Sequence, residues 1–286
     1  LDAPGLGVKD GDYLLAIEGK PLQAGDDVFR FLVGTAGKPT RITVSSTPDT
    51  TNARSLTVVP SPGTNALRRF AWAEANRKRV ETLSGGRIGY VYVPEYGLGV
   101  EDFLSGVLGY GGRVEGIVID QRFNGGGITP DALIGMLRAE PWFAYRYRYG
   151  ADVVVPANTL EGPKVLLVHE QNGSAAETGA LMAKLTHAAT LVGKATYGAG
   201  IGAALDQPNL IDGGGIAIPN RASYDPAGTW GIENIGVQPD VVVEDDPESW
   251  RTGKDPQLEA AVHVALREIG TTKQRPWKRP EFPMHP

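Results

Sequence analysis

Ser174 is the residue whose type and position could do covalent chemistry. It stands in His169-Glu170-Gln171-Asn172-Gly173-Ser174-Ala175-Ala176-Glu177, after the apolar run Lys164–Val168 and before helical spacing over Glu177–Leu185. The run predicts a buried parallel strand, so Ser174 falls at a strand-to-helix turn. Such a turn exposes the hydroxyl as a nucleophile and offers it the free N–H groups of the helix's first turn. A structural alternative is an N-cap, with Glu177 completing a capping box.

A second turn could provide the rest of an oxyanion hole. Arg122-Phe123-Asn124-Gly125-Gly126-Gly127 follows the apolar run Gly116–Asp120 and precedes a predicted helix over 130–138. Three glycines let the backbone approach a ligand closely and present N–H groups to it. The run lacks the lysine of a phosphate-binding loop and does not match G-x-G-x-x-G. It is either a simple turn or one side of an oxyanion hole whose other side is the Ser174 turn.

Other chemistries find little support in the sequence. The absence of cysteine excludes thiolate nucleophiles and disulfides. The four histidines are scattered and form no H-x-x-x-H pattern, so we expect no metal site, and no cofactor is indicated. His169 is expected to pack at a strand end. The net charge of −5, without a Lys/Arg cluster, argues against nucleic-acid binding. No apolar run reaches the ~18 residues of a membrane helix.

The elements that must position the two turns alternate between strand and helix. Strands are predicted at 88–93, 116–120, 164–168 and from 190, with helices at 103–108, 130–138, 177–185 and 256–269. This alternation predicts an α/β layer around a parallel sheet. A hairpin arm is expected over 211–219, around Gly213-Gly214-Gly215.

The first sixty residues have a different, β-rich pattern. Strands are predicted at 13–17, 41–44 and 55–59 and a short helix at 26–33. The run from Gly5 to Pro21 resembles the "GL-x-x-GD-x-I-L-x-I-N-G-x-P" segment of PDZ domains, of which the first strand and carboxylate-binding loop would precede Leu1. We therefore divide the chain into a partial PDZ domain (1–62), a helical connector (63–86) and a catalytic core with a C-terminal helix and loose tail (87–286). The chain is expected to be part of a longer protein.

The order of motifs resembles that of the S41 serine peptidases. After the PDZ-like unit come D-x-R-F-N-G-G-G, N-G-S-A-A-E, V-G-K-A-T-Y-G and G-I-E-N-I-G-V-Q-P-D. The resemblance implies a crotonase-like α/β/α core. Carboxy-terminal processing members use a Ser–Lys dyad, and the position of their lysine is Ala199 here, which argues against that mechanism for this chain. Lys194 does not match it. The tricorn-type branch lacks this lysine and is the better match.

The resemblance to the tricorn-type branch also implies roles for individual residues. Ser174 is the expected nucleophile, Glu233 the carboxylate of a Ser–His–Ser–Glu tetrad, and the N–H groups of Ala175 and Gly127, with Gly126, the oxyanion hole. A segment upstream of this chain would supply the Ser–His pair, so the isolated chain should be nearly inactive. The branch has an Asp directly after the nucleophile, where this chain has Ala175.

Partners and alternatives follow from the same resemblance. Peptide substrates and a homo-oligomer, hexameric in the tricorn type, are implied, and we expect a cytoplasmic protein without nucleic-acid or membrane partners. One alternative is an inactive S41-fold protein that binds peptides or acts as a scaffold. Another is a crotonase-type enzyme acting on acyl thioesters, whose fold also uses two backbone N–H groups.

Overall fold

The computed structural model describes residues 5–97, 99–110, 113–128, 130–156, 159–203, 209–271 and 278–283. The chain forms two compact units, Leu1–Ala71 and Trp72–Pro286. The helices described are too short or too polar to cross a membrane.

The first unit is a small antiparallel sheet with one short helix. Its strands β1 (Tyr13–Ile17), β2 (Lys20–Pro21), β3 (Thr40–Ser45) and β4 (Arg54–Val58) pair in the order β2-β1-β3-β4. The buried side chains of Ile17, Ile42 and Val44 form its core. Helix α1 (Val28–Phe31) is a single turn, shorter than the helix predicted over 26–33, because Asp27 caps its start and Leu32 its end.

Helix α2 (Asn65–Ser84) begins in the first unit and ends in the second. Its exposed face carries ion pairs at helical spacing, with Arg77 Nε 2.7 Å from Glu74 and Arg77 Nη1 3.0 Å from Glu81. Val80 on the other face is fully buried against the second unit's sheet. The buried residues of the helix are Asn76, Val80 and Ser84, one turn apart, and the helix lies within the connector predicted over 63–86.

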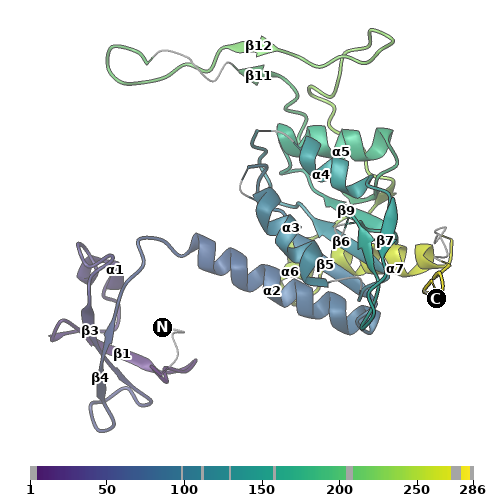
Figure 1. The fold of residues 1–286 in the computed structure, drawn as a ribbon. Coiled ribbons are helices and arrows are strands. Elements are labelled where there is room, and N and C mark those ends of the chain that lie inside the picture. The colour runs from purple at the N-terminus through teal and green to yellow at the C-terminus, as the bar shows by residue number, and fades with distance from the viewer. Residues whose placement is uncertain are drawn as a thin grey trace. The chain divides into compact units, whose positions relative to one another are not determined.

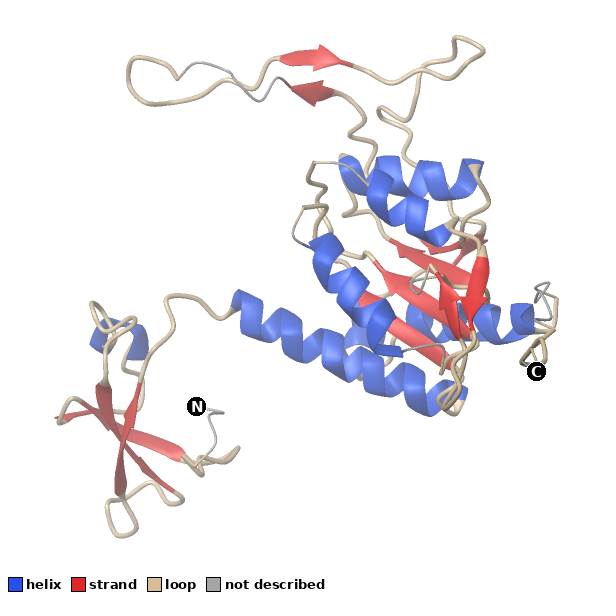
Figure 2. Ribbon diagram, in the orientation of Figure 1, coloured by secondary structure: helices blue, strands red, loops and turns tan. Residues whose placement is uncertain are grey.

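The second unit is built on a five-stranded parallel sheet. Its strands are β5 (Ile88–Tyr92), β6 (Gly116–Asp120), β9 (Lys164–Val168), β10 (Thr190–Gly193) and β13 (Val241–Val242), in the order β13-β10-β9-β6-β5. The helices are α3 (Gly99–Tyr110), α4 (Asp131–Leu137), α5 (Ala175–Leu185), α6 (Pro247–Arg251) and α7 (Pro256–Ile269). Figure 1 and Figure 2 show α4 and α5 over one face of the sheet and α7 across the other. The predicted α/β architecture is thus confirmed.

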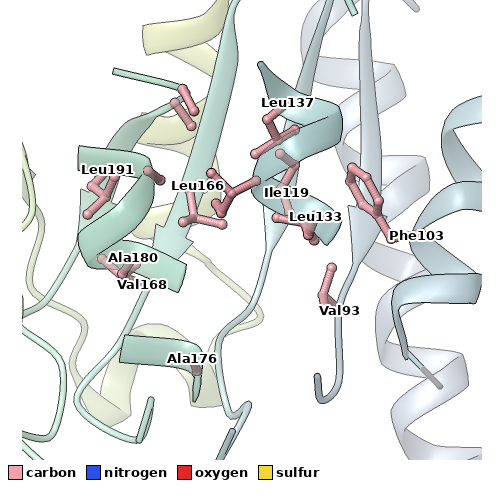
Figure 3. Close-up of a cluster of buried hydrophobic side chains, with 14 of the residues drawn as sticks. Val93, Phe103, Ile119, Leu133, Leu137, Leu166, Val168, Ala176, Ala180 and Leu191 are labelled. Atoms are coloured by element: carbon pink, nitrogen blue, oxygen red, sulfur yellow. The ribbon is translucent and has the colours of Figure 1, made fainter. Parts of the chain in front are cut away.

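Successive side chains along the buried strands point to opposite faces of the sheet and fill both layers of the core. Ile119 and Leu166 point to the face covered by α3, α4 and α5, where Figure 3 shows them among Phe103, Leu133 and Ala180. Val118 and Leu167, one position along, pack on the opposite face against α7. Both faces of the central strands are covered, which explains their continuous apolar sequence.

Antiparallel hairpins project from this core. One joins β7 (Phe143–Tyr145) to β8 (Val153–Val155), and an arm joins β11 (Gly202–Ala203) to β12 (Pro219–Arg221). The sequence predicts the hairpin arm over 211–219, whereas the strands of the arm pair at 202–203 and 219–221. At the start of the predicted range, Leu210 N donates to Gly214 O at 2.7 Å and closes a turn over the glycines. Three consecutive glycines have no side chains to pack on a sheet and favour such turns.

Candidate active site

The two predicted turns meet at one edge of the parallel sheet. Strands β6 and β9 are hydrogen-bonded neighbours, so the loops that follow them leave the sheet side by side. Two buried asparagines join these loops. Asn172 Nδ2 donates to Asn124 O at 3.1 Å and to Gln121 O at 2.5 Å, and Gly173 N donates to Asn124 O at 3.4 Å. The two turns therefore form one hydrogen-bonded unit.

Ser174 occupies a strained turn directly before α5. Its backbone has φ 54° and ψ −122°, a conformation that residues with a Cβ rarely adopt. The residue is exposed, while Ala175 and Ala176 behind it are buried. Strain of this kind costs about 1–3 kcal/mol and is concentrated at functional sites. The fold thus holds this serine outside the sheet at an energetic cost.

The glycine loop approaches the serine turn too closely for a side chain. A Cβ on Gly126 (φ +113°) would lie 2.8 Å from Ser174 Cβ and 2.9 Å from Gly173 O. A Cβ on Gly127 (φ +143°) would lie 2.1 Å from Tyr96 O. By contrast, a Cβ on Gly125 would meet nothing within 4 Å. Of the three glycines in this loop, Gly126 and Gly127, which the sequence singles out, are therefore the two whose positions require glycine.

A buried tyrosine holds the glycine loop in place. Tyr96 N donates to Gly126 O at 2.7 Å, and Ile128 N donates to Tyr96 O at 2.6 Å. The Tyr96 hydroxyl donates to Gln121 Oε1 at 2.8 Å, and burial raises the pKa of this hydroxyl. Within the described parts of the chain, the N–H groups of Gly127 and Ala175 donate to no other group. Both remain available to a ligand oxygen.

Glu177 is the residue whose importance the sequence understates. It is fully buried, and its carboxylate accepts four hydrogen bonds. Its Oε2 binds Ser174 N at 3.2 Å and Ala199 N at 2.7 Å, and its Oε1 binds Gly198 N and Thr196 Oγ1, both at 2.6 Å. The capping interaction predicted from the spacing is present on the Glu177 side. The other three partners come from a distant loop that the spacing could not reveal.

This distant loop leads to Glu233. The backbone of residues 198–201 lies against that of 232–234, with Asn234 N donating to Gly198 O at 2.7 Å. Glu233 is half-buried, and its Oε2 accepts Ile201 N at 2.8 Å. The loop that shares the Glu177 carboxylate with Ser174 thus also holds Glu233. Ala199 contributes its N–H to this arrangement.

A buried ion-pair network lies beneath the glycine loop. Arg122 is fully buried, with Nη2 2.8 Å from Asp120 and Nη1 2.8 Å from Asp255 at the start of α7. Burial disfavours its charged form, but the two carboxylates outweigh this effect and raise the pKa of the guanidinium. The guanidinium also lies 5.4 Å from the Trp72 ring centroid and 5.8 Å from that of Trp250. The first residue of the loop motif is thereby fixed from several sides.

Lys194 and His169 are engaged with acidic side chains. Lys194 Nζ lies 3.0 Å from Glu170 and 3.5 Å from Asp245, and His169 Nε2 lies 3.4 Å from Asp245. His169, Glu170 and Asp245 could together offer a cation three ligand atoms within 4.8 Å of one another. However, the Lys194 ammonium already pairs with both carboxylates, and His169 Nδ1 accepts a hydrogen bond from Gln171 N at 3.3 Å. This bond favours the tautomer with the proton on Nε2, where a metal would have to bind. These contacts account for the cluster as an ion-pair network.

Comparison with known proteins identifies the family of the chain. The model of peptidase family S41 matches residues 87–243, and that of the tricorn protease PDZ domain matches residues 1–61. The chain is 30% identical to the tricorn protease of Thermoplasma volcanium over 91% of this chain and 25% of that protein. It is 34% identical to tricorn protease homolog 1 of Streptomyces coelicolor over 95% of this chain and 25% of that protein.

A solved structure extends the similarity to the backbone. The crystal structure of the tricorn protease matches with a TM-score of 0.83 and 30% identity, covering 91% of this chain and 25% of that one. The chain spans about a quarter of the length of the curated relatives it matches. On the family matches, their order along the chain and this fold, the chain belongs to peptidase family S41 and is similar to its tricorn proteases.

Proposed function

We propose that this chain carries the nucleophile and oxyanion hole of a tricorn-type serine peptidase that cleaves peptides by acyl transfer. The observation that carries the proposal is the strained, exposed Ser174 beside two N–H groups that no described group occupies, those of Gly127 and Ala175. An N-cap alone requires neither the glycine contact nor the unusual backbone of the serine.

The chemistry follows the usual course of acyl transfer. Ser174 Oγ attacks the carbonyl carbon of the peptide bond and passes its proton to a general base. The carbonyl oxygen becomes an oxyanion, which the Gly127 and Ala175 N–H groups stabilise, with Gly126 shaping the loop. When the tetrahedral intermediate collapses, the C–N bond breaks and the amine leaves with the proton. Water then releases the acyl group from Ser174 by the same steps in reverse order.

The general base is proposed to lie in a segment that precedes this chain. His169 is turned towards Asp245, and His263 is exposed on α7. Glu233 is proposed to orient the serine–histidine pair of the upstream segment, as the third group of a catalytic triad orients its base. The isolated chain should then be nearly inactive, since losing one member of such a set typically costs ~10⁴–10⁶-fold in kcat.

The resemblance to tricorn proteases extends the proposal to the setting of the enzyme. We propose peptide substrates, a homo-oligomeric assembly, hexameric by family resemblance, and a cytoplasmic location. Gel filtration with light scattering on the chain and on a longer form that includes the preceding segment measures the assembly state. A monomer in both forms contradicts this part of the proposal.

The test of the nucleophile is the intact mass after exposure to a fluorophosphonate serine probe. A longer form of the chain, extended upstream to include the preceding segment, should gain one adduct that Ser174→Ala lacks. The 286-residue chain should gain little. Gly126→Ala should abolish the adduct because its Cβ would displace Ser174, whereas Gly125→Ala, with open space around it, should keep the adduct.

The opposite outcome favours the second candidate function, an inactive peptide-binding protein of the same fold. The involvement of His169 and Lys194 in a separate ion-pair network is the observation that supports this candidate. If the longer form remains unlabelled while Ser174→Ala and wild type bind peptides equally well, the peptidase proposal is wrong.

A further inference from the structure

A cavity of about 270 Å³ opens beside Glu233, at the base of the arm. Its walls are the side chains of Ile201, Ala222, Trp230 and Ile232, and glycine backbone closes the gaps between them. The polar side chains on its lining are those of Ser223 and Glu233. Glu233 Oε2 is already engaged with Ile201 N at 2.8 Å. The cavity therefore offers a ligand mainly carbon surface.

The cavity is connected to the nucleophile through two short links. Ala199 N and Ser174 N both bind Glu177 Oε2, at 2.7 and 3.2 Å, so the two backbones lie on either side of one oxygen atom. Gly200, the next residue, lines the cavity. A Cβ on Gly200 would lie 2.9 Å from Ile232 Cγ1 and 3.1 Å from Glu233 N, which shows how closely these two loop segments pass. When a peptide is bound at Ser174, one of the peptide's side chains close to the cleaved bond can reach this cavity.

The outer wall of the cavity is a structured hairpin. Gly231 N donates to Ser223 O at 2.9 Å, Tyr224 bridges Trp230, and their rings lie 6.2 Å apart at an interplanar angle of 78°. Asp225 closes the turn by accepting Thr229 N at 2.9 Å. The hairpin holds Trp230 with 73% of its surface exposed. A large indole fixed at the edge of an apolar cavity is typical of a surface that a ligand covers.

We propose that this cavity is a specificity subsite that binds an apolar side chain of the peptide substrate, with Trp230 and Ile201 as the selecting walls. This inference rests on the proposed peptidase function. A basic side chain is the natural competitor, because Trp230 could contact its cation and Glu233 could pair with it. The carbon-rich lining and the hydrogen bond already accepted by Glu233 favour the apolar side chain.

Peptide binding tests the subsite without requiring catalysis. Fluorescein-labelled alanine heptapeptides with a central Phe, Leu, Ala or Lys are titrated with the 286-residue chain, and anisotropy gives the Kd of each. The Phe peptide should bind about tenfold or more tightly than the Ala peptide, because a well-formed apolar pocket discriminates by about that factor for even smaller differences. The Lys peptide should gain no comparable advantage.

Variants of the walls show whether the cavity is responsible. Trp230→Ala, which removes a wall, and Ala222→Trp, which fills the space, should each reduce the Phe preference to within about twofold. Trp142→Ala is the matched control, because Trp142 is similarly exposed (76%) but lies on the β7 hairpin. It should keep the preference. The subsite is refuted if no peptide binds to wild type, if Lys is preferred, or if both wall variants keep the tenfold difference.

The same measurements separate this inference from the proposed function. If the fluorophosphonate probe fails on the longer form but the Phe preference depends on Trp230, the subsite stands and the peptidase function fails. If Ser174 is labelled and the wall variants change nothing, the peptidase function stands and the subsite fails.

Discussion

The buried carboxylate of Glu177 gives the most informative single perturbation, Glu177→Gln. The substitution keeps the size of the side chain and replaces one oxygen by an NH₂ group. If this group takes the place of Oε2, it faces the N–H donors of Ser174 and Ala199. If it takes the place of Oε1, the Thr196 hydroxyl can turn to accept from it, but Gly198 N–H then loses its acceptor.

The expected loss of stability is worked out for the less costly orientation of the new amide, with its NH₂ group in place of Oε1. One buried donor left without a partner costs about 1–3 kcal/mol, and the remaining bonds lose the strengthening effect of the charge. Because Glu177 is fully buried, solvent does not compensate for these losses. We expect the second unit to lose about 2–4 kcal/mol of unfolding free energy. For a domain of this size, that corresponds to a fall in Tm of roughly 5–15 °C.

Differential scanning calorimetry measures this change, and the fluorophosphonate labelling rate of the longer form reports on the site. Labelling should fall at least tenfold, since the Glu177 carboxylate holds Ser174 and the 198–201 loop together. Glu248→Gln on α6 is the control, because Glu248 is an exposed partner of Arg251, and it should stay within about 0.5 kcal/mol of wild type. If Glu177→Gln melts and labels like this control, our account of Glu177 is wrong.

Three further predictions concern the same unit. Ser174→Gly should raise the unfolding free energy of the second unit by about 1 kcal/mol in urea titrations, because glycine relieves the strained backbone. It should also abolish labelling, because the hydroxyl is gone. A loss of stability would contradict the proposed backbone strain. Arg122→Met should cost about 3–5 kcal/mol in the same assay, since two buried carboxylates lose their partner; a change below 1 kcal/mol would argue against the network. Burial acts to raise the pKa of Asp245, but the Trp250 and His169 hydrogen bonds and the Lys194 charge hold it below its ordinary 3.8. The Asp245 carboxylate therefore contributes stability above pH 3.8, and this contribution is lost as the pH falls further. In urea titrations from pH 6 to 3, the difference in unfolding free energy between wild type and Asp245→Asn should narrow only below about pH 4. A difference that does not change with pH would contradict the lowered pKa.

The parts of the fold that the sequence predicts well are those set by local pattern. The strands around Val165 and Ile117 are continuous apolar runs between turn residues, and a parallel sheet buries such runs on both faces. The glycine loop and Ser174 can be located in the sequence for the same reason, because each lies between a predicted strand and a predicted helix. The pairing of β11 with β12 was missed, since strands of two or three residues without a buried position have no pattern to detect.

The contacts that complete the site depend on residues far apart in the chain. The spacing of Ser174 and Glu177 predicts a cap, yet nothing near Glu177 in the sequence indicates that Gly198 and Ala199 also bind it. In the same way, Asp255 looks like a helix cap, which it is, but its bond to Arg122 crosses more than a hundred residues. Tertiary packing decides such pairings, and no local pattern in a single sequence predicts them.

The bond between Arg122 and Asp255 has a consequence for the order of events during synthesis. The ribosome completes β6 and the glycine loop long before it reaches the start of α7. Until Asp255 emerges, Arg122 would have only Asp120 as a carboxylate partner, and the sheet face that α7 covers would remain open to water. A nascent chain that stops short of α7 should therefore be a substrate for chaperones and proteases, with its core unable to close. The glycine loop would take its final shape only after α7 has been synthesised and has packed against the sheet, so a chain that stops before α7 would lack the finished arrangement around Ser174.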